Sequence, residues 1–434
     1  MNNKTHKLIP ELRFSEFVNK EEWISEPLNK TYRFLITNSF SRENLNYKDG
    51  LVKNIHYGDI HTKFSTLFDI QKERVPYINS NISIDRINQD NYCEEGDIVF
   101  ADASEDIQDV GKSIEIINLN DEKLLSGLHT LLARQIEQKL IIGFGGYLFK
   151  SEFIRKQIQK EAQGTKVLSI SATRISKINI YYPKSPIEQK KIVDCFASLD
   201  ELITAHIDKL ETLKTYKKGL MQNLFPQEGE KVPKLRFKKF EKDGNWEKKS
   251  LEKVADIVTG NTPSTNETQY YNGGKLFVSP ADINEYRYLT QTRTRLSDLG
   301  FSRTRKIKEN SVLFVCIGST IGKIVQTKVE CATNQQINSL TCFENYSDDF
   351  LYSVLEHHAS KIADLAGNHA VPIINKSTFS AIELNFPPTF EEQQKVAVTF
   401  SSLDELISEQ ANKIENLKLH KKGLMQGLFP KVKN

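Results

Sequence analysis

Side chains that could carry out chemistry are few in this chain of 434 residues. The segment from Gly318 to Lys323 superficially matches a phosphate-binding loop. However, its glycines are too close together, and Ile324 stands where a magnesium-binding Ser or Thr is required. The run at 143–146 lacks the full dinucleotide fingerprint and is interpreted as a turn, and His357–His358 is interpreted as a helix surface. Motifs of amino-methyltransferases are absent from the sequence. It therefore predicts no catalytic residues and no metal site.

The composition excludes several classes of protein. Lys and Arg total 59 against 56 for Asp and Glu, and the formal charge of +3 is too small for a protein that coats DNA by charge alone. No apolar run approaches the roughly 18 residues of a membrane-spanning helix, and the N-terminus has no apolar core for a secretory signal. The five cysteines form no CxxC pair, which favours free thiols over a disulfide framework. We therefore expect a cytoplasmic protein that does not bind a membrane.

The most informative feature is an internal repeat. Residues 183–226 align without a gap with residues 387–430 at an offset of 204, and 24 of the 44 positions are identical. A second, shorter repeat lies upstream of each copy at an offset of 223. Its members are Pro10, Leu12, Arg13, Phe14, Phe17, Trp23 and Leu28, matched by Pro233, Leu235, Arg236, Phe237, Phe240, Trp246 and Leu251. The chain therefore consists of two similar halves whose middles, about 29–182 and 252–386, are dissimilar.

Each 44-residue repeat has the pattern of a long helix. Capping boxes at Ser185–Glu188 and Thr389–Glu392 mark the starts, where the hydroxyl and the carboxylate could both satisfy free amide donors. Gly219 and Gly423 mark a fray or cap near the ends. A helix over about 188–220 would be roughly 50 Å long.

Apolar residues in both helices recur at the spacing of a coiled-coil seam, interrupted by His206 and Gln410. They are Phe196, Leu199, Ile203, Leu210 and Leu213 in the first helix, and Phe400, Leu403, Ile407, Ile414 and Leu417 in the second. The simpler alternative is an amphipathic helix packed on a globular core. Because neither helix has another obvious partner, we predict that the two pair as an antiparallel coiled coil.

The predicted fold class is mixed α/β (α+β), with two variable domains separated by the two paired helices and related by a pseudo-two-fold repeat. The predicted regions are 1–182 with its repeat motif at 7–28, a central helical region at 183–229, 230–386 with its motif at 230–251, and a C-terminal helical region at 387–434.

These motifs resemble the specificity (S) subunit of type I restriction–modification enzymes over nearly the whole chain. Most specific are Glu188–Gln189 and Glu392–Gln393, the repeated SLDELI and KKGLMQ segments, and the paired LRF…W openings. The second middle region adds further matching segments: TGNTP at 259–263, YYNGG at 270–274, IGSTIGK at 317–323 and TNQQI at 333–337. The first has a companion pattern: Gly58–Ile60, GDIVFADASED at 96–106 and SGLHT at 126–130.

The resemblance implies a non-catalytic subunit with two target-recognition domains. Each domain would read one half of a bipartite target in double-stranded DNA, and the helices would dock two methyltransferase (M) subunits. No cofactor is expected in this chain. The resemblance places S-adenosylmethionine in the M subunits, and ATP and Mg in the restriction and translocation (R) subunits. The alternative is a protein-only coiled-coil scaffold, or an anti-restriction relative, without sequence-specific DNA binding.

Charge alone does not locate the DNA. Residues 28–182 carry 20 basic and 20 acidic groups, residues 251–386 carry 13 and 14, and residues 183–250 carry 15 and 11. Phosphate contacts must then come from local clusters. The candidates are Arg293, Arg295, Arg303, Arg305, Lys306 and Lys323 in the second domain, and Lys63, Arg74, Arg86, His129 and Arg134 in the first. The arginine run could equally be a solvated turn, and we favour a structural role for TNQQ.

The repeated lysine pairs Lys217–Lys218 and Lys421–Lys422 leave two possibilities open. They could contact phosphates between the two half-targets. We slightly favour the other interpretation, in which they are solvated charges at the negative ends of the helix dipoles.

Overall fold

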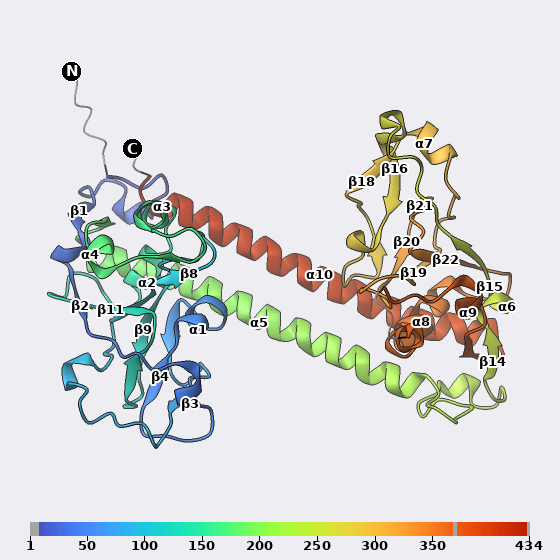
Figure 1. Cartoon of the computed structure of the whole chain (residues 1–434), viewed down its shortest axis with the longest axis horizontal. Helices are drawn as coiled ribbons and strands as arrows, with labels where there is room; N and C mark the ends of the chain where they lie inside the picture. Colours follow the sequence, from blue (N-terminus) through green and yellow to red (C-terminus); the bar gives the residue numbers. More distant parts are fainter. Residues whose placement is uncertain (1–7, 368–370, 432–434) are drawn as a thin grey trace. The chain divides into compact units, whose positions relative to one another are not determined.

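The computed structural model describes residues 8–367 and 371–431 and divides into two compact units. Unit 1 comprises residues 1–205 and 415–434, and unit 2 comprises residues 206–414. The division cuts both long helices, α5 (Pro186–Leu224) and α10 (Phe390–Leu428), so that each unit contains part of each helix. In Figure 1 the blue-to-green elements of unit 1 accompany the red C-terminal end of α10. The ends of the predicted outer regions, 1–7 and 432–434, lie outside the described residues.

Unit 1 is built on a mixed five-stranded sheet with the order β2-β11-β7-β9-β5. Its strands are β2 (Tyr32–Leu35), β5 (Leu67–Asp69), β7 (Ile98–Ala101), β9 (Ser113–Asn118) and β11 (Thr130–Gln135). Neighbouring strands are antiparallel except β5 and β9, which are parallel. The central strand β7 has the sequence IVFA and is fully buried, as expected for a continuous apolar run covered on both faces.

A second small sheet in unit 1 has the order β10-β4-β6-β3. Its strands are β3 (Leu45–Asn46), β4 (Lys53–Ile55), β6 (Tyr77–Ile78) and β10 (Leu124–Ser126), and β4 pairs in parallel with β10. A further two-stranded sheet pairs β8 (Ala103–Ser104) with β12 (Leu168–Ser169). The helices are α1 (Tyr57–Thr62), α2 (Phe144–Leu148), α3 (Glu152–Glu161) and α4 (Ala172–Ile175).

Unit 2 repeats this topology although the sequences of the two middles differ. Its five-stranded sheet has the order β15-β22-β19-β20-β17, and taken in chain order its strands occupy the same positions as those of unit 1. They are β15 (Ala255–Thr259), β17 (Tyr288–Leu289), β19 (Val312–Val315), β20 (Ile324–Thr327) and β22 (Ile337–Cys342). The counterpart of β7 is β19, whose sequence VLFV is again fully buried.

The small sheet of unit 2 also keeps its parallel pair. Its order is β18-β16-β21, with β16 (Tyr271–Val278) parallel to β21 (Ala332–Thr333) and antiparallel to β18 (Thr294–Leu296). The helices are α6 (Leu251–Val254), α7 (Asp298–Ser302), α8 (Asp348–Ala363) and α9 (Lys376–Ser380). The GSTIGK segment is the loop between antiparallel strands β19 and β20, which is not the strand–loop–helix context of a phosphate-binding loop.

In each unit, the repeat motif is joined to the strand that leads into a long helix. In unit 1, β1 (Ile24–Pro27) pairs antiparallel with β13 (Asn179–Tyr182). In unit 2, β14 (Glu247–Ser250) pairs in the same way with β23 (Glu383–Phe386). Each pair brings an upstream repeat to the start of α5 or α10.

The two long helices pack antiparallel in both units, which confirms the predicted pairing. In unit 2, Phe225 contacts Phe400, Lys217 contacts Asp404 and His206 contacts Gln410, so the residue number falls along α5 as it rises along α10. In unit 1, Phe196 stacks on Phe429 with ring centroids 6.2 Å apart, and Asp200 pairs with Lys421. The Phe225–Phe400 and Lys217–Asp404 contacts recur at the 204-residue offset as Phe429–Phe196 and Lys421–Asp200, and the His206–Gln410 pair maps onto itself, so these contacts follow the repeat.

The predicted seam residues lie at this helix–helix contact or beside it. Phe196, Ile203, Phe400, Leu403, Ile407 and Ile414 are at most 8% exposed, and the other four are half-buried. The interruption at His206 and Gln410 is itself a contact. The Gln410 amide nitrogen lies 2.7 Å from His206 Nδ1 and donates to the His206 carbonyl at 2.7 Å.

A buried carboxylate joins the start of each long helix to the upstream repeat. Arg13 donates from Nε and Nη2 to the two oxygens of Glu188 at 2.7 and 2.8 Å, and Trp23 Nε1 donates to the same carboxylate at 3.2 Å. Arg236, Trp246 and Glu392 form the same arrangement in unit 2, at 2.8, 2.8 and 3.1 Å. We call each arrangement an Arg–Glu–Trp lock.

The structure corrects two details of the predicted helices. The hydroxyls of Ser185 and Thr389 do accept amide bonds, but the Glu188 and Glu392 carboxylates belong to the locks and do not complete capping boxes. In addition, both helices continue to Leu224 and Leu428, beyond the glycines expected near their ends. An isolated glycine weakens a helix by only about 1 kcal/mol, which tertiary packing overcomes.

Each repeat motif also contacts the end of a long helix. In unit 1 the Leu12 amide donates to the Gly427 carbonyl at 2.9 Å, and the Trp23 ring meets Phe429 edge-on at 5.9 Å. In unit 2 the Leu235 amide donates to the Asn223 carbonyl in the same way.

Within residues 8–367 and 371–431, no helix combines the length and hydropathy that a bilayer-spanning segment requires.

The first lock predicts a large loss of stability in Glu188→Gln. Arg13 and Glu188 are 5% and 2% exposed, so the variant leaves a buried guanidinium without its counter-charge. We expect the free energy of unfolding to fall by about 3–5 kcal/mol in urea denaturation. The control is Glu16→Gln, which removes the exposed partner of Lys191 and should leave the unfolding midpoint unchanged. Equal effects of the two substitutions would contradict the lock.

Candidate nucleic-acid interface

The motifs that the sequence singled out in the second middle region converge on one edge of unit 2. Gly260 follows β15 and lies against the segment after β21, where a Cβ at this position would be 2.2 Å from the Thr333 carbonyl oxygen. Thr262 donates to the side-chain oxygen of Gln335 at 2.8 Å, and Gln336 reaches the Ile317 carbonyl at 3.3 Å. The TGNTP, TNQQI and IGSTIGK segments therefore form one cluster of loops.

Two arginines of the predicted basic run belong to this cluster. Asn261 donates to the Arg303 carbonyl at 3.1 Å and accepts from the Arg305 amide at 2.8 Å. The Arg305 guanidinium also donates to the Thr259 carbonyl at 2.6 Å. Both side chains are exposed, and in the part of the chain that the structure describes neither lies within ion-pair distance of a carboxylate. Both guanidinium groups are therefore available to bind phosphates.

The other candidates of the second domain are exposed but more scattered. The Arg293 amide is held by the Asp282 carboxylate at 2.8 Å, and Arg295 on β18 donates to Gly274 at 3.3 Å. Lys306 lies over the Phe301 ring at 5.6 Å. Lys323 donates to the Ile283 carbonyl at 3.1 Å, so its ammonium is partly engaged within the protein.

In unit 1 a basic cluster is organised around the buried carboxylate of Asp59 on α1. Arg42 donates to both oxygens of Asp59 at 2.7 and 3.1 Å, and Lys63 pairs with it at 2.8 Å. Burial raises the pKa of Asp59, but the hydrogen bonds from Arg42 and Lys63 outweigh it and leave the pKa lowered. The carboxylate stays ionised and holds two half-exposed cations side by side.

Tyr47 extends the same cluster. The Arg74 guanidinium lies over its ring at 4.8 Å, and Lys63 reaches its hydroxyl at 3.3 Å. Arg42 and Tyr47 were not among the residues predicted from sequence. The sequence held one signal for them, because Arg42, Tyr47 and Lys63 interleave basic and aromatic side chains around the predicted Gly58–Ile60 motif. Basic and aromatic groups together suit phosphates and bases.

Aromatic contacts connect this cluster to the SGLHT segment. His56 accepts from Arg42 and lies 4.7 Å from the Tyr57 ring, which meets His129 edge-on at 5.3 Å. Burial and the nearby Arg42 charge lower the pKa of His56, so its ring is neutral near pH 7. His129 Nδ1 lies 3.2 Å from the Asp102 carboxylate.

Two other predicted residues of unit 1 are placed differently. Arg134 is committed to the interior, because its five N–H groups donate to Asp97, Glu94, Asp90 and Tyr92 at 2.6 to 3.2 Å. These bonds leave it no donor for a phosphate. Arg86 is exposed and lines a separate pocket beside Phe34 and Asn88.

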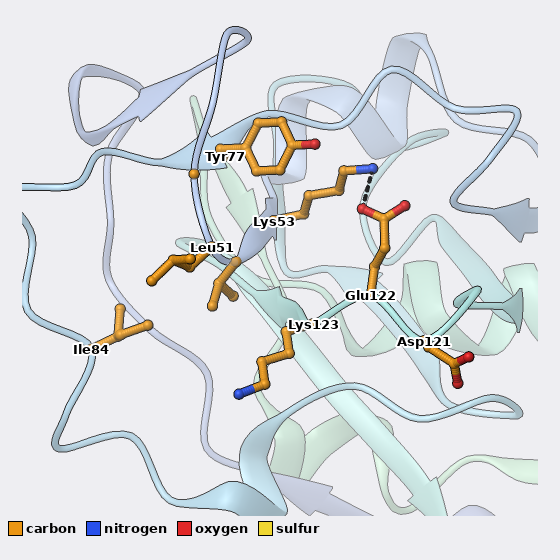
Figure 2. Close-up of a pocket in the computed structure, with 9 residues that line it drawn as sticks. Leu51, Lys53, Tyr77, Ile84, Asp121, Glu122 and Lys123 are labelled. Carbon is orange, nitrogen blue, oxygen red and sulfur yellow. Dashed lines mark ion pairs between the residues drawn. The ribbon is translucent and has the colours of Figure 1, made fainter.

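A further pocket of unit 1 lies at the opposite end of the parallel strands β4 and β10 from the SGLHT segment. Figure 2 shows Lys53 beside the Tyr77 ring and paired with Glu122, with Lys123 and Leu51 around it. The Lys53–Glu122 distance is 2.7 Å. The residues that line this pocket carry both positive and negative charges, which does not favour the binding of a polyanion. Among the described residues, no group of three His, Cys, Asp or Glu side chains is arranged to hold a metal ion.

The first lysine of each repeated pair is neither a phosphate contact nor a solvated charge. Lys217 is buried and pairs with Glu356 at 2.6 Å and Asp404 at 2.5 Å. Asp404 also accepts from the buried Arg287 at 3.3 Å. Lys421 pairs with Asp200 in unit 1. These lysines stabilise the pairing of the two long helices, whereas Lys218 and Lys422 are exposed.

Comparison with known proteins gives consistent matches. A family model described as "Type I restriction modification DNA specificity domain" matches residues 54–215 and 243–419. The chain is 27% identical over 316 residues to the "Type I restriction enzyme HindI specificity subunit" of Haemophilus influenzae, covering 71% of this chain and 63% of that protein. It is 25% identical over 344 residues to the "Putative type I restriction enzyme MjaX specificity subunit" of Methanocaldococcus jannaschii, covering 77% of each. The first of these matches spans less than two thirds of the Haemophilus protein.

Two solved structures share the fold. The S subunit of a type I restriction–modification system from M. genitalium has a TM-score of 0.63 at 13% identity, covering 98% of this chain and 100% of that one. A chain from a study of complex assembly and conformational transition in the type I system has a TM-score of 0.54 at 15% identity, covering 94% and 97%. At these identities the likeness concerns the fold alone.

The buried ion pairs of Lys217 predict a structural effect for Lys217→Met. The substitution leaves the Glu356 and Asp404 carboxylates without their shared cation, so the free energy of unfolding should fall by about 3 kcal/mol. Lys218→Met is the matched control on the adjacent exposed position and should leave stability unchanged. The measurement is urea denaturation of both variants. A stable Lys217→Met protein would show that the pairs do not hold the helix.

The exposed arginines predict a change in the salt dependence of DNA binding. Arg303→Gln should reduce the slope of log affinity against log salt concentration by about 0.9, because one phosphate contact is lost. The measurement is titration of a random-sequence duplex at several salt concentrations. Lys253→Gln is the control, because Lys253 lies on α6 at the other end of β15 from Gly260. A slope unchanged by Arg303→Gln would remove this edge from the interface.

Proposed function

Since the chain belongs to the family of type I restriction modification DNA specificity domains, we propose that it selects the DNA sequence on which a type I restriction–modification enzyme acts. The observation that carries this proposal is the duplicated recognition architecture. The two units have sheets of the same strand order, and each unit carries a cluster of loops with exposed basic side chains. The polar, apolar and aromatic residues of the two clusters differ. Each unit would therefore read a different half of a bipartite target in double-stranded DNA.

The chain contributes recognition and assembly and no catalytic groups. Its polar residues at the candidate interface are arranged to bind, and the sequence carries no methyltransferase motif. The methyl donor S-adenosylmethionine would be held by two M subunits, and ATP and Mg by R subunits. The proposed location is the cytoplasm, where such an assembly would meet its DNA.

The outer faces of the long helices support docking of two identical subunits. The predicted seam residues are largely buried between the helices, so partners must contact other positions. Leu202 and Leu406 occupy equivalent positions and are 43% and 50% exposed. Exposed Ser198 and Lys209 recur as Ser402 and Lys413. Retention of the same exposed residues in both halves is expected if each half contacts one copy of the same M subunit.

The proposal predicts a two-part methylation target. The measurement is single-molecule sequencing of methylated adenines in a host that carries this chain and its M subunit. Exchanging residues 29–182 for the corresponding domain of another family member should change one half of the target and leave the other half and the spacing between the halves unchanged. The reciprocal exchange of residues 252–386 is the matched control and should change only the other half.

Two outcomes would count against this function. A change in both halves after one exchange would mean that the units do not read independently. Absence of any sequence-specific binding by the chain with its M subunit would favour a protein-only scaffold.

A further inference from the structure

The basic cluster of unit 1 is built outward from a buried carboxylate. The Asp59 side chain is 1% exposed and pairs with both Arg42 and Lys63. The two Nη groups of Arg42 donate to the two oxygens of Asp59 at 2.7 and 3.1 Å. The same groups also donate to His56 Nδ1 at 3.1 Å and to the Tyr47 hydroxyl at 3.3 Å. Arg42 is therefore largely committed to holding its neighbours, and the free groups of the cluster lie further out.

The hydroxyl of Tyr47 receives two cations at once. Arg42 Nη1 and Lys63 Nζ each donate to its oxygen at 3.3 Å. A phenolic hydroxyl has two lone pairs and one O–H. Because both lone pairs accept from the cations, the O–H is left to donate to a group outside the cluster. Tyr47 is 37% exposed, so part of this side chain lies at the surface.

Arg74 and Lys63 supply further donors beside this hydroxyl. The Arg74 guanidinium is exposed and lies 4.8 Å from the centre of the Tyr47 ring. Among the described residues, its five N–H groups have no hydrogen-bond or ion-pair partner. The Lys63 ammonium uses two of its three N–H groups, one on Asp59 at 2.8 Å and one on Tyr47. Donors from three side chains therefore lie together around the Tyr47 ring.

We propose that Arg74, Lys63 and the Tyr47 hydroxyl together bind one phosphate of the DNA backbone. We call these three groups the phosphate clamp, and Asp59 is its positioning residue. This inference rests on the proposed function and adds residues to it. The free oxygens of a backbone phosphate carry negative charge and accept several hydrogen bonds, which matches a set of donors that includes two cations. The clamp would fix where unit 1 lies on the duplex without selecting a base.

Asp59 acts on the clamp only through other side chains. Its carboxylate fixes Lys63 directly and fixes the Tyr47 hydroxyl through Arg42. The Tyr47 ring in turn holds Arg74, because a guanidinium is attracted to the face of an aromatic ring. Loss of the Asp59 charge would therefore loosen all three donors, although it would make this surface more positive.

Unit 2 has a carboxylate at the equivalent position. Asp59 lies four residues after the end of β4 and Asp282 lies four residues after the end of β16, and each strand is parallel to the strand that leads back into the large sheet. Asp282 accepts from the backbone amide of Arg293 at 2.8 Å, and the Arg293 side chain is exposed. In both units, a carboxylate at this position anchors a segment that bears an exposed cation. This recurrence is expected if the position serves DNA binding in both units.

The sign of one substitution separates the clamp from simple attraction by charge. The chain is assembled with its M subunit and titrated with a random-sequence duplex. Asp59→Asn removes a negative charge, yet it should weaken binding about tenfold, because the donors lose their alignment. The matched control is Asp49→Asn, which neutralises an exposed carboxylate of the same segment and should leave the affinity unchanged or slightly higher. Equal or tighter binding by the Asp59→Asn complex would overturn the positioning role.

Two further variants test the clamp without removing a buried charge. Arg74→Gln should reduce the slope of log affinity against log salt concentration by about 0.9, because one phosphate contact is lost. Tyr47→Phe removes only the hydroxyl and should weaken binding at every salt concentration. In the Asp59→Asn background, both substitutions should have smaller effects than in the unaltered chain, and fully additive effects would contradict positioning by Asp59. Unchanged affinity and slope in both single variants would show that no phosphate binds here.

Controls separate this inference from loss of folding and from failure of the function itself. Urea denaturation should give unchanged midpoints for Arg74→Gln and Tyr47→Phe, since both side chains are exposed. Sequencing of methylated adenines should give the same target as the unaltered chain, because a phosphate contact selects no base. A changed target, or loss of M-subunit binding in place of DNA affinity, would overturn the clamp. If the unaltered complex bound no duplex, the proposed function would fail first, irrespective of these variants.

Discussion

A buried carboxylate at the start of each long helix fixes how this chain is assembled. The side chains of Glu188 and Glu392 are 2% and 1% exposed, and each carboxylate pairs with an arginine and accepts a hydrogen bond from a tryptophan of the upstream repeat. A carboxylate buried at this depth is tolerated only with such partners, since an unpaired buried charge is strongly destabilising. The lock therefore requires the repeat motif, the strand pair beside it and the helix start to come together in every half. In each half, these contacts at the helix start position the recognition sheet.

Charge also holds the helices to each other and to the sheets. Asp200 and Asp404 are equivalent positions, paired with Lys421 and Lys217. Their surroundings differ, because Asp200 accepts from Tyr147 at 3.0 Å whereas Asp404 accepts from Arg287. The shared pair maintains one helix geometry while the added partner is specific to each recognition domain. This explains how the same scaffold carries two middles with little sequence similarity.

Sequence reasoning recovered the architecture because repetition is visible without a structure. The 204-residue offset gave both helices, their antiparallel pairing and the seam. It did not give the roles of Lys217 and Glu188, because a residue repeated for a buried ion pair and one repeated for a ligand look the same in a sequence. The common sheet topology of the two units was also hidden, since strands β7 and β19 share apolar character but only one identical residue, a phenylalanine at the third position.

The candidate site was only partly predictable for a related reason. The arginine run near Arg303 was found by charge, but Arg42 was missed because its partner Asp59 lies 17 residues away in the sequence. Arg134 was selected by charge although its donors are all used by the strand edges around Asp97. Basic residues can be counted from a sequence. Whether a guanidinium is already satisfied depends on tertiary contacts, which only the fold reveals.

The central claim is that two separate units read two halves of one DNA target. Hydrogen–deuterium exchange of the assembled chain, with and without its target duplex, tests it most directly. Segments 126–130 and 333–337 should both become protected on the full target, and scrambling one half of the duplex should remove protection from one segment only. Protection confined to the long helices, or to the Lys53–Glu122 pocket, would contradict the account.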